Sequence, residues 1–260
     1  HSPCFPMMPQ SLPNGTPLLT RRESLGLIAL AALGCTRLGA AAEGNWEPLF
    51  DGRTLNGWKP TAKSPHSKAS NFTSGGHWEA REGAIIGGQE PRLNGGLLLT
   101  EREFGDFEVS VETNNDFGPD SGLFLRCTED GKAYQCLIDY HKGGTIGGVL
   151  GEGIWKRRGE RNFTFGERPE LITINPHAQP CPFTPESWKQ IWKVGGWNEV
   201  RARIVGDPPV ITTWVNGVQI LSYREPVSQH PARGRIGLQV HGGAGFDGLV
   251  RYRNLRVRLL

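Results

Sequence analysis

The sequence predicts an all-β protein, a β-sandwich of jelly-roll type. About a dozen short segments alternate apolar and polar residues, and no segment beyond residue 42 has a convincing helical period. Turn-forming residues are abundant, with 36 Gly and 19 Pro among 260 residues, and they follow no repeat. Many short strands separated by such turns are typical of sandwiches and barrels.

The chain is predicted to divide into a leader, residues 1–42, and one folded domain, residues 43–260. Arg21 and Arg22 precede an apolar run, and residues 40–42 are alanines that offer a cleavage site. The paired arginines indicate twin-arginine export, so a periplasmic or cell-envelope location is expected. Cys35 lies in a weak lipoprotein cleavage box, which is an alternative. The apolar run is too short to span a bilayer, and no transmembrane segment is expected in the mature chain.

Charge and cysteine content limit the function classes. Residues 1–42 hold three Arg and one Glu, so the remaining chain carries 26 basic and 25 acidic residues. A net charge of +1 without a basic stripe does not indicate nucleic-acid binding. Cys127, Cys136 and Cys181 remain after the leader. The sequence is compatible with a Cys127–Cys136 disulfide and equally with three free thiols. The sequence contains no C-x-x-C pair, so it does not indicate a cysteine zinc site.

The first part of the domain is predicted to contain several strands. Residues 46–58 hold aromatic side chains around two Gly turns, and residues 78–88 form a strand, a Glu-Gly turn and a strand. Strands follow at residues 96–100 and 106–113. Alternation in the last of these separates Phe107, Val109 and Val111 on one face from Glu108, Ser110 and Glu112 on the other.

The stretch 120–152 is predicted to contain a β-hairpin with its turn at Asp130 and Gly131. Asp-Gly supplies the positive φ that a hairpin connection requires. Placing Cys127 opposite Cys136 sorts the side chains into an apolar face and a polar face. The polar face carries Phe124, Arg126, Gln135, Leu137, Asp139 and His141.

This polar face is predicted to form the floor of a pocket. Its alternative is a face whose charges simply meet water, as many antiparallel hairpins have. Gly122, which the chosen register places across from His141, favours a pocket. A residue without a side chain leaves room there for a ligand or a close backbone.

The passage 142–186 is predicted to be irregular, with one short strand candidate at residues 171–174. A passage of this length is usually functional, often a lid, or disordered. Its basic run, Lys156, Arg157 and Arg158, is interpreted as part of a solvated loop.

Alternation returns towards the C-terminus. Asn216-Gly217 between alternating segments is the strongest hairpin signal in the chain. Gln239 and His241 share one face of their predicted strand. The strands expected in this part are residues 197–206, 210–215, 218–221, 234–241 and 249–260.

Several motifs occur in a characteristic order. They are Leu49-Phe50-Asp51-Gly52, Leu55-Asn56-Gly57-Trp58, Ser121-Gly122 with Phe124 and Arg126, Trp197-Asn198, Asn216-Gly217, Ile236-Gly237-Leu238-Gln239 with His241, and Arg253-Asn254-Leu255. Together they resemble the 3-keto-disaccharide hydrolase family over roughly residues 46–259. The resemblance implies a concanavalin A-like jelly roll of two antiparallel sheets, one of them concave and sugar-binding. The chain departs from the family pattern at Asp120, where Asn is usual, and at Leu137, where a polar Gln is usual.

The resemblance implies a hydrolase that acts on 3-keto-glycosides, and the predicted leader implies that it is exported. A ketone at C3 acidifies the proton on C2, so the glycosidic bond can break by proton abstraction and elimination, followed by addition of water. That route needs a general base and donors to the enolate oxygen. The candidate catalytic residues are His141, Asp139, Glu112 and Glu152, and the candidate substrate-binding residues are Arg126, Gln135, Gln239 and His241.

Three further hypotheses remain open. An ordinary two-carboxylate glycosidase would use Glu108 and Glu112, although Ser110 replaces the middle acid of the usual strand. A non-catalytic carbohydrate-binding module would need aromatic side chains on the concave face, and Trp58, Trp78 and Trp155 are available. No cofactor is predicted. A divalent metal stays open, because Asp139, His141, Glu152 and His241 are acceptable ligands, although their spacing matches no zinc signature.

Overall fold

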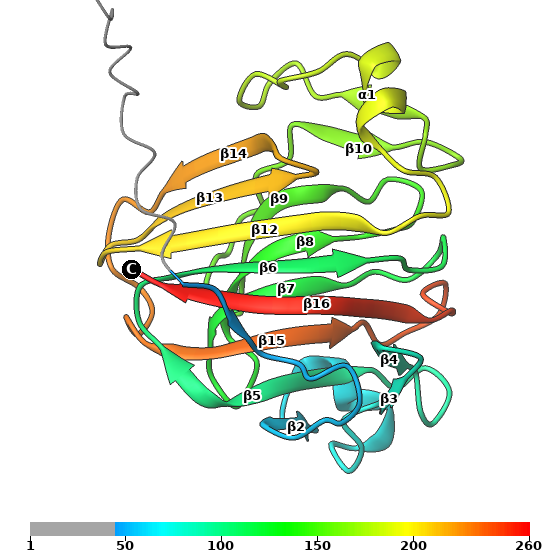
Figure 1. The fold of residues 1–260 in the computed structure, drawn as a ribbon, viewed down its shortest axis with the longest axis vertical. Coiled ribbons are helices and arrows are strands. Elements are labelled where there is room, and N and C mark those ends of the chain that lie inside the picture. Colours follow the sequence, from blue (N-terminus) through cyan, green and yellow to red (C-terminus); the bar gives the residue numbers. More distant parts are fainter. Residues whose placement is uncertain (1–44) are drawn as a thin grey trace, which may run out of the picture. The chain divides into compact units, whose positions relative to one another are not determined.

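The computed structural model describes residues 45–260, which form two antiparallel sheets packed face to face (Figure 1). The jelly-roll prediction is confirmed. The predicted leader lies outside the described residues, so the leader and export remain predictions. Within the described range, no helix is both long and apolar enough to cross a bilayer.

The larger sheet has eight strands in the order β14-β13-β12-β6-β16-β4-β3, with β1 paired to β16. Its members are β1 (Glu47–Pro48), β3 (His77–Arg81), β4 (Ala84–Gly88), β6 (Phe107–Thr113), β12 (Asn198–Val205), β13 (Val210–Val215), β14 (Val218–Arg224) and β16 (Val250–Leu259).

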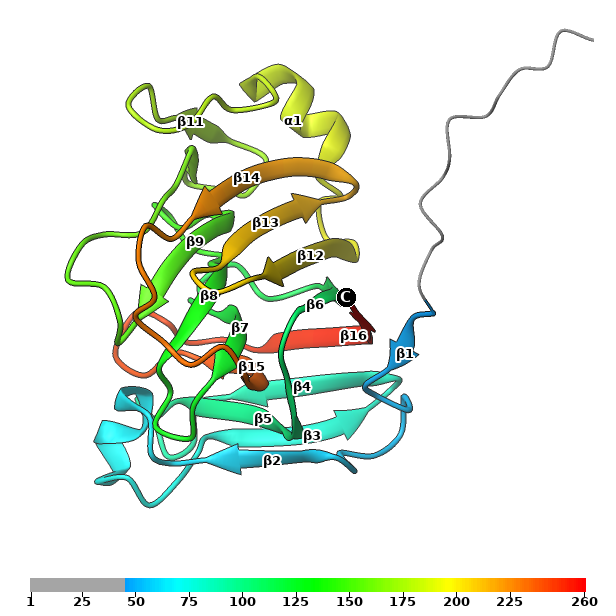
Figure 2. The same cartoon turned by 90° about the vertical axis from the view of Figure 1, so that its left-hand side faces the viewer.

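The smaller sheet has six strands in the order β2-β5-β15-β7-β8-β9. They are β2 (Trp58–Thr61), β5 (Gly96–Phe104), β15 (Gly234–Val240), β7 (Gly122–Cys127), β8 (Ala133–Ile138) and β9 (Ile146–Glu152). A short hairpin of β10 (Phe163–Phe165) and β11 (Ile172–Ile174), with helix α1 (Pro185–Ile191), lies beyond β14 and β9 at one edge of the sandwich (Figures 1 and 2). The 3₁₀ helix η1 is Pro65–Ser70.

The core lies between the two sheets. It takes Phe107, Val109 and Val111 from β6, as alternation predicted, and Leu123 and Leu125 from β7. Each fully buried side chain of this size contributes about 1.5–3 kcal/mol to folding. The second face of the smaller sheet carries a separate apolar cluster, made of Leu97, Leu99, Phe124, Cys127 and Ala133.

The predicted register of the β7–β8 hairpin is wrong by four residues. Cys136 pairs with Leu123 rather than with Cys127, because the connection is longer than a two-residue turn. An even shift preserves the faces. A bulge in β7, where Arg126 has a φ of 54°, then moves Cys127 to the face opposite Cys136. Cys127, Cys136 and Cys181 are free thiols.

The passage 142–186 is more ordered than predicted. It contains β9, which was not predicted because its glycines have a low β-propensity. It also contains β11, which lies within the strand predicted at residues 171–174. It also ends in α1, a helix that the sequence reading missed. Thr184 caps this helix by accepting a hydrogen bond from the backbone N–H of Ser187, and the Ser187 side chain bonds back to the cap.

Candidate functional site

A chain of amide and imidazole side chains crosses the outer face of the smaller sheet. Gln135 Nε2 donates to Gln239 Oε1 at 2.9 Å, and Gln239 Nε2 lies 2.8 Å from His66 Nε2. Burial lowers the pKa of His66 to about 3, so its ring is neutral and can accept from Gln239. Gln135 and Gln239 therefore lie on one face, as predicted, and they form a rigid floor.

Gly122 makes this floor possible in a different way from the one predicted. It pairs with Leu137, not with His141. A Cβ at Gly122 would lie 2.1 Å from Gln135 Nε2. The missing side chain thus leaves room for Gln135 to reach Gln239, and not for a ligand.

His241 lies at the end of β15 and outside the core, as predicted. Its Nδ1 is 2.5 Å from the Gly242 carbonyl oxygen, which can only accept, so Nδ1 carries a proton. Its Nε2 is 3.9 Å from Asp120 Oδ2. The ring packs between His66 and Phe246, with centroid distances of 4.8 and 4.4 Å. These contacts orient the imidazole.

Asp139 and Asp120 form a pair of carboxyl groups beside His241. Asp139 is fully buried, and no donor among the described residues reaches either of its oxygens. Arg161 Nη2 comes to 3.8 Å, too far for a hydrogen bond. Burial and the nearby charge of Asp120 raise the pKa of Asp139 well above its usual value. Asp139 therefore keeps its proton to a higher pH than an exposed carboxyl does.

His141 joins the same cluster from the turn after β8. Burial lowers the pKa of His141 below its usual value, although the charge of Asp120 opposes the shift. Its Nδ1 is buried without a hydrogen-bond partner in residues 45–260, and its ring meets the edge of Phe246. Gly144 packs against it, since a Cβ there would lie 2.8 Å from His141 Nδ1. The predicted Asp139 and His141 thus lie in one cluster with His241.

A pocket of about 620 Å³ opens beside this cluster. Glu152, the last residue of β9, lines it together with His66, Lys68, Leu93 and His241. Burial raises the pKa of Glu152 above its usual value, although the charge of His241 opposes the shift. A carboxylate that faces a pocket with a raised pKa is suited to proton transfer near neutral pH.

Arg126 does not take part in this site. The bulge turns its side chain away, and only 1% of the side chain is exposed. Nε donates to the Gly105 carbonyl and Nη1 to the Gly206 carbonyl, both at 2.9 Å, while Nη2 lies 2.6 Å from Asp106 Oδ1. The prediction that Arg126 lines the same face as Gln239 is wrong, because strand alternation fails at a bulge.

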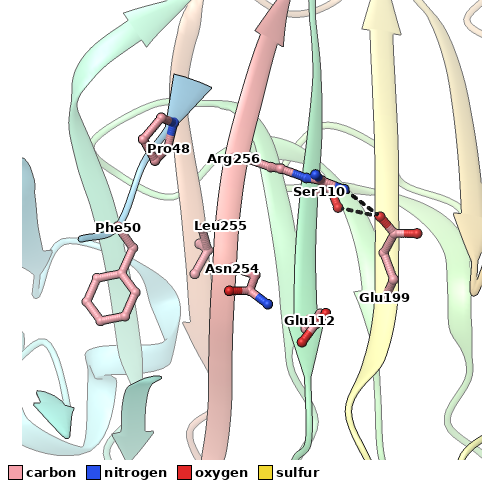
Figure 3. A pocket seen from close by; sticks show the side chains of 8 residues that line it. All are labelled: Pro48, Phe50, Ser110, Glu112, Glu199, Asn254, Leu255 and Arg256. Atoms are coloured by element: carbon pink, nitrogen blue, oxygen red, sulfur yellow. Dashed lines mark hydrogen bonds and ion pairs between the residues drawn. The ribbon is translucent and has the colours of Figure 1, made fainter. Parts of the chain in front are cut away.

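Glu112 also lies elsewhere, on the outer face of the larger sheet. It lines a shallow pocket of about 310 Å³ across β16, β6 and β12, where Ser110 and Arg256 bond to Glu199 (Figure 3). Glu112 accepts a hydrogen bond from Arg253 at 2.7 Å. Burial alone would raise the pKa of Glu112, but hydrogen bonds from Arg253 and Asn254 lower it overall. Glu112 therefore stays ionised and is unsuited to act as a general acid.

The geometry does not favour a two-carboxylate glycosidase mechanism. Glu108 and Glu112 lie on one strand, but arginines hold both carboxylates, and Arg253 is the partner of Glu112. Glu108 is buried between Arg201 and Arg258, which lie 3.2 and 3.0 Å from its oxygens. Neither carboxylate is free for chemistry.

The described residues support neither a carbohydrate-binding module built on stacked tryptophans nor a metal site. Trp58 and Trp78 are buried, and each indole donates to a backbone carbonyl. The Trp155 indole donates to Glu225 and packs on Tyr223. None of the three lines the two pockets described above. Within residues 45–260, no three His, Cys, Asp or Glu side chains gather in a way that could hold a metal ion.

The sequence reading missed three members of the cluster. His66 lies in η1, far along the chain from the hairpin, and no local pattern marks it. Arg161 lies in the passage that looked irregular. The sequence did mark Asp120 as unusual, because the family that this chain resembles usually has Asn at that position.

Comparisons with known proteins agree with this architecture. Residues 45–258 match the family model of the 3-keto-alpha-glucoside-1,2-lyase-like domain. No curated protein matches the chain. A candidate glycosyl hydrolase from Parabacteroides distasonis superposes with a TM-score of 0.51 at 16% identity, covering 84% of this chain and 95% of that one. A second from the same organism has a TM-score of 0.48 at 18% identity, covering 83% and 100%.

A carbohydrate-binding module from Bacillus subtilis has a TM-score of 0.41 at 14% identity, covering 78% of this chain and 95% of that one. At these identities, the likeness to solved structures extends to the fold alone.

Proposed function

Because the chain belongs to the family of 3-keto-alpha-glucoside-1,2-lyase-like domains, and so has a carbohydrate-active function, we propose that it cleaves 3-keto-glucosides by 1,2-elimination and then adds water. The pocket where Glu152 and His241 meet carries this proposal. Its volume of about 620 Å³ is within the range of small-molecule sites and is ample for one sugar ring.

Glu152 is the general base in this mechanism. It takes the C2 proton, which the C3 ketone makes acidic. Burial raises the pKa of Glu152, which makes its carboxylate a stronger base than an exposed one while leaving it able to ionise. The sequence also suggested Asp139 for this role, but Asp139 is fully buried and cannot contact the sugar.

His241 supports the negative charge that develops on the C3 oxygen. Its Nδ1 proton is bonded to Gly242, and its Nε2 lies on the side of Asp120. The His241 ring lines the pocket, where a hydrogen bond donated by the ring to the enolate oxygen would support that charge. Asp139 acts behind Asp120 as a positioning residue.

The proton count closes over the two stages. In the first stage, the C2–H bond and the C1–O bond break, C1 and C2 form a double bond, and the proton leaves with the aglycone as its alcohol. In the second stage, water adds its hydroxyl to C1 and its proton to C2, which gives the free 3-keto sugar. The net reaction consumes one water for each bond cleaved.

The test uses D2O as solvent. The purified protein should release the 3-keto sugar from a 3-keto-glucoside, leave the parent glucoside intact, and place deuterium at C2 of the product. Turnover without deuterium at C2 would instead indicate displacement at C1. The variant Glu112→Gln separates the two mechanisms further, since it should retain turnover here and lose it if the larger sheet carried the chemistry.

A further inference from the structure

A second cavity, of about 730 Å³, opens on the same face of β9 as the Glu152 pocket. Leu150 lines this cavity and Glu152 lines the first. Residues i and i+2 of a strand point to the same face and lie about 7 Å apart. The two cavities are therefore neighbours on one surface, as the subsites for two adjoining units of a glycoside would be.

Two threonines from the β10–β11 hairpin form one wall of the second cavity. Thr164 and Thr173 are directly paired across the hairpin, and both line the cavity. Phe163 and Phe165 point to the opposite face and are buried in the core. Alternation thus holds the hairpin on the sandwich and directs two hydroxyls outward. In the described part of the chain, neither hydroxyl has a hydrogen-bond partner.

Two arginines supply positive charge to the same cavity, which no Asp or Glu of the described range lines. Arg157 is engaged elsewhere, 2.7 Å from Glu160 and over the Trp155 ring. Arg158, its neighbour, forms no ion pair with any described residue. Arg161 is close to one carboxyl, that of Asp139 at 3.8 Å. That contact also places the cavity wall beside the proposed reaction centre.

The pairing of acids around the cavity leaves this charge uncompensated. Glu160, Glu167 and Glu170 are the acidic side chains of residues 153–175, and each is paired with another cation: Arg157, Lys142 and Arg168. Guanidinium groups bind carboxylate, sulfate and phosphate through two parallel hydrogen bonds, and hydroxyls add donors to the same oxygens. A neutral sugar would leave the Arg158 guanidinium without an anionic partner among the described residues.

We infer that this cavity is the aglycone subsite and that it selects aglycones bearing an acidic group. The inference rests on the proposed function, since it names the substrate class of that same site. The anionic group would contact Arg158, Arg161 and the Thr164–Thr173 pair, while the keto sugar occupies the Glu152 pocket.

A matched pair of substrates tests the inference on the full-length protein. The 3-keto-glucosides of 4-carboxyphenol and of its carboxamide differ in charge but hardly in shape. Each partly exposed arginine adds about fivefold at most, so we expect kcat/KM to favour the acid by about five- to twentyfold. Arg158→Gln should reduce this preference by about threefold to fivefold. Lys156→Gln removes an exposed cation from the same run and should leave the preference unchanged.

The outcomes separate the inference from the proposed function. If both substrates are cleaved with equal kcat/KM, or the preference survives Arg158→Gln in a folded variant, the subsite inference is overturned while the proposed function stands. If neither is cleaved, both are overturned. Inorganic sulfate should inhibit cleavage of both substrates competitively, because it would occupy the cavity that either aglycone enters, and Arg158→Gln should weaken this inhibition. Sulfate inhibition that is not competitive with the substrate, or that Arg158→Gln leaves unchanged, would overturn the aglycone assignment. Thr164→Val offers a second variant with the same expected direction.

Discussion

Replacing Arg126 with Ala should destabilise the fold rather than impair substrate binding. The guanidinium makes two hydrogen bonds to the Gly105 and Gly206 carbonyls and one contact with Asp106. Each carbonyl bond is worth about 1 kcal/mol net. The Asp106 side chain is 40% exposed, so its ion pair adds about 1 kcal/mol at most. The free energy of unfolding should therefore fall by about 3 kcal/mol.

The measurement is urea unfolding, together with kcat of the folded variant at low temperature. For a domain of this size, a loss of this magnitude lowers Tm by about 6–12 °C. Arg81→Ala is the matched control, because its ion pair with Glu79 is exposed and the change should be under about 0.5 kcal/mol. An unchanged urea midpoint with a large drop in kcat would refute this reasoning and return Arg126 to the substrate-binding role that strand alternation suggested.

Three further predictions concern the site itself. Glu152→Gln should lower kcat by roughly 10²–10⁴-fold and abolish the rise of activity with pH that follows ionisation of Glu152, which a pH–rate profile would show. Gly122→Ala should destabilise the protein by about 1–3 kcal/mol, because the methyl group displaces Gln135; denaturation midpoints equal to wild type would contradict this. Asp139 binds its proton more tightly when folded, so its contribution to stability falls as pH rises from about 4 towards its raised folded pKa. Asp139→Asn should lack that decline, and parallel stability curves for the two proteins between pH 4 and 8 would argue against it.

Local sequence patterns accounted for most of the strands, several of the turns and most side-chain faces. Alternation in β6 correctly separated Phe107, Val109 and Val111 from Glu112. Asn216-Gly217 formed the predicted turn, with both residues at positive φ. These features depend on neighbours within a few residues, and for that reason one sequence is enough to find them.

The site was predicted only where alternation held without interruption. Gln135, Asp139, His141, Gln239 and His241 came together because their strands keep period two or end close to their neighbours. The prediction for Arg126 was wrong because one extra residue in β7 reverses the face on which the following side chains lie. The predicted register of the hairpin was wrong because its loop is longer than the Asp-Gly pair indicates. Neither event leaves a mark in a local pattern.

The sequence by itself determined that this chain is a β-sandwich, and its ordered motifs determined the family. Only the tertiary structure decided which charges meet. His66 reaches Gln239 across 173 positions, and Asp120 lies close to Asp139, whose side chain is fully buried. The pKa of a carboxyl depends on burial and on nearby charge, and both are properties of the packed molecule. A glutamate at the end of a strand becomes a candidate base only after distant segments close around it.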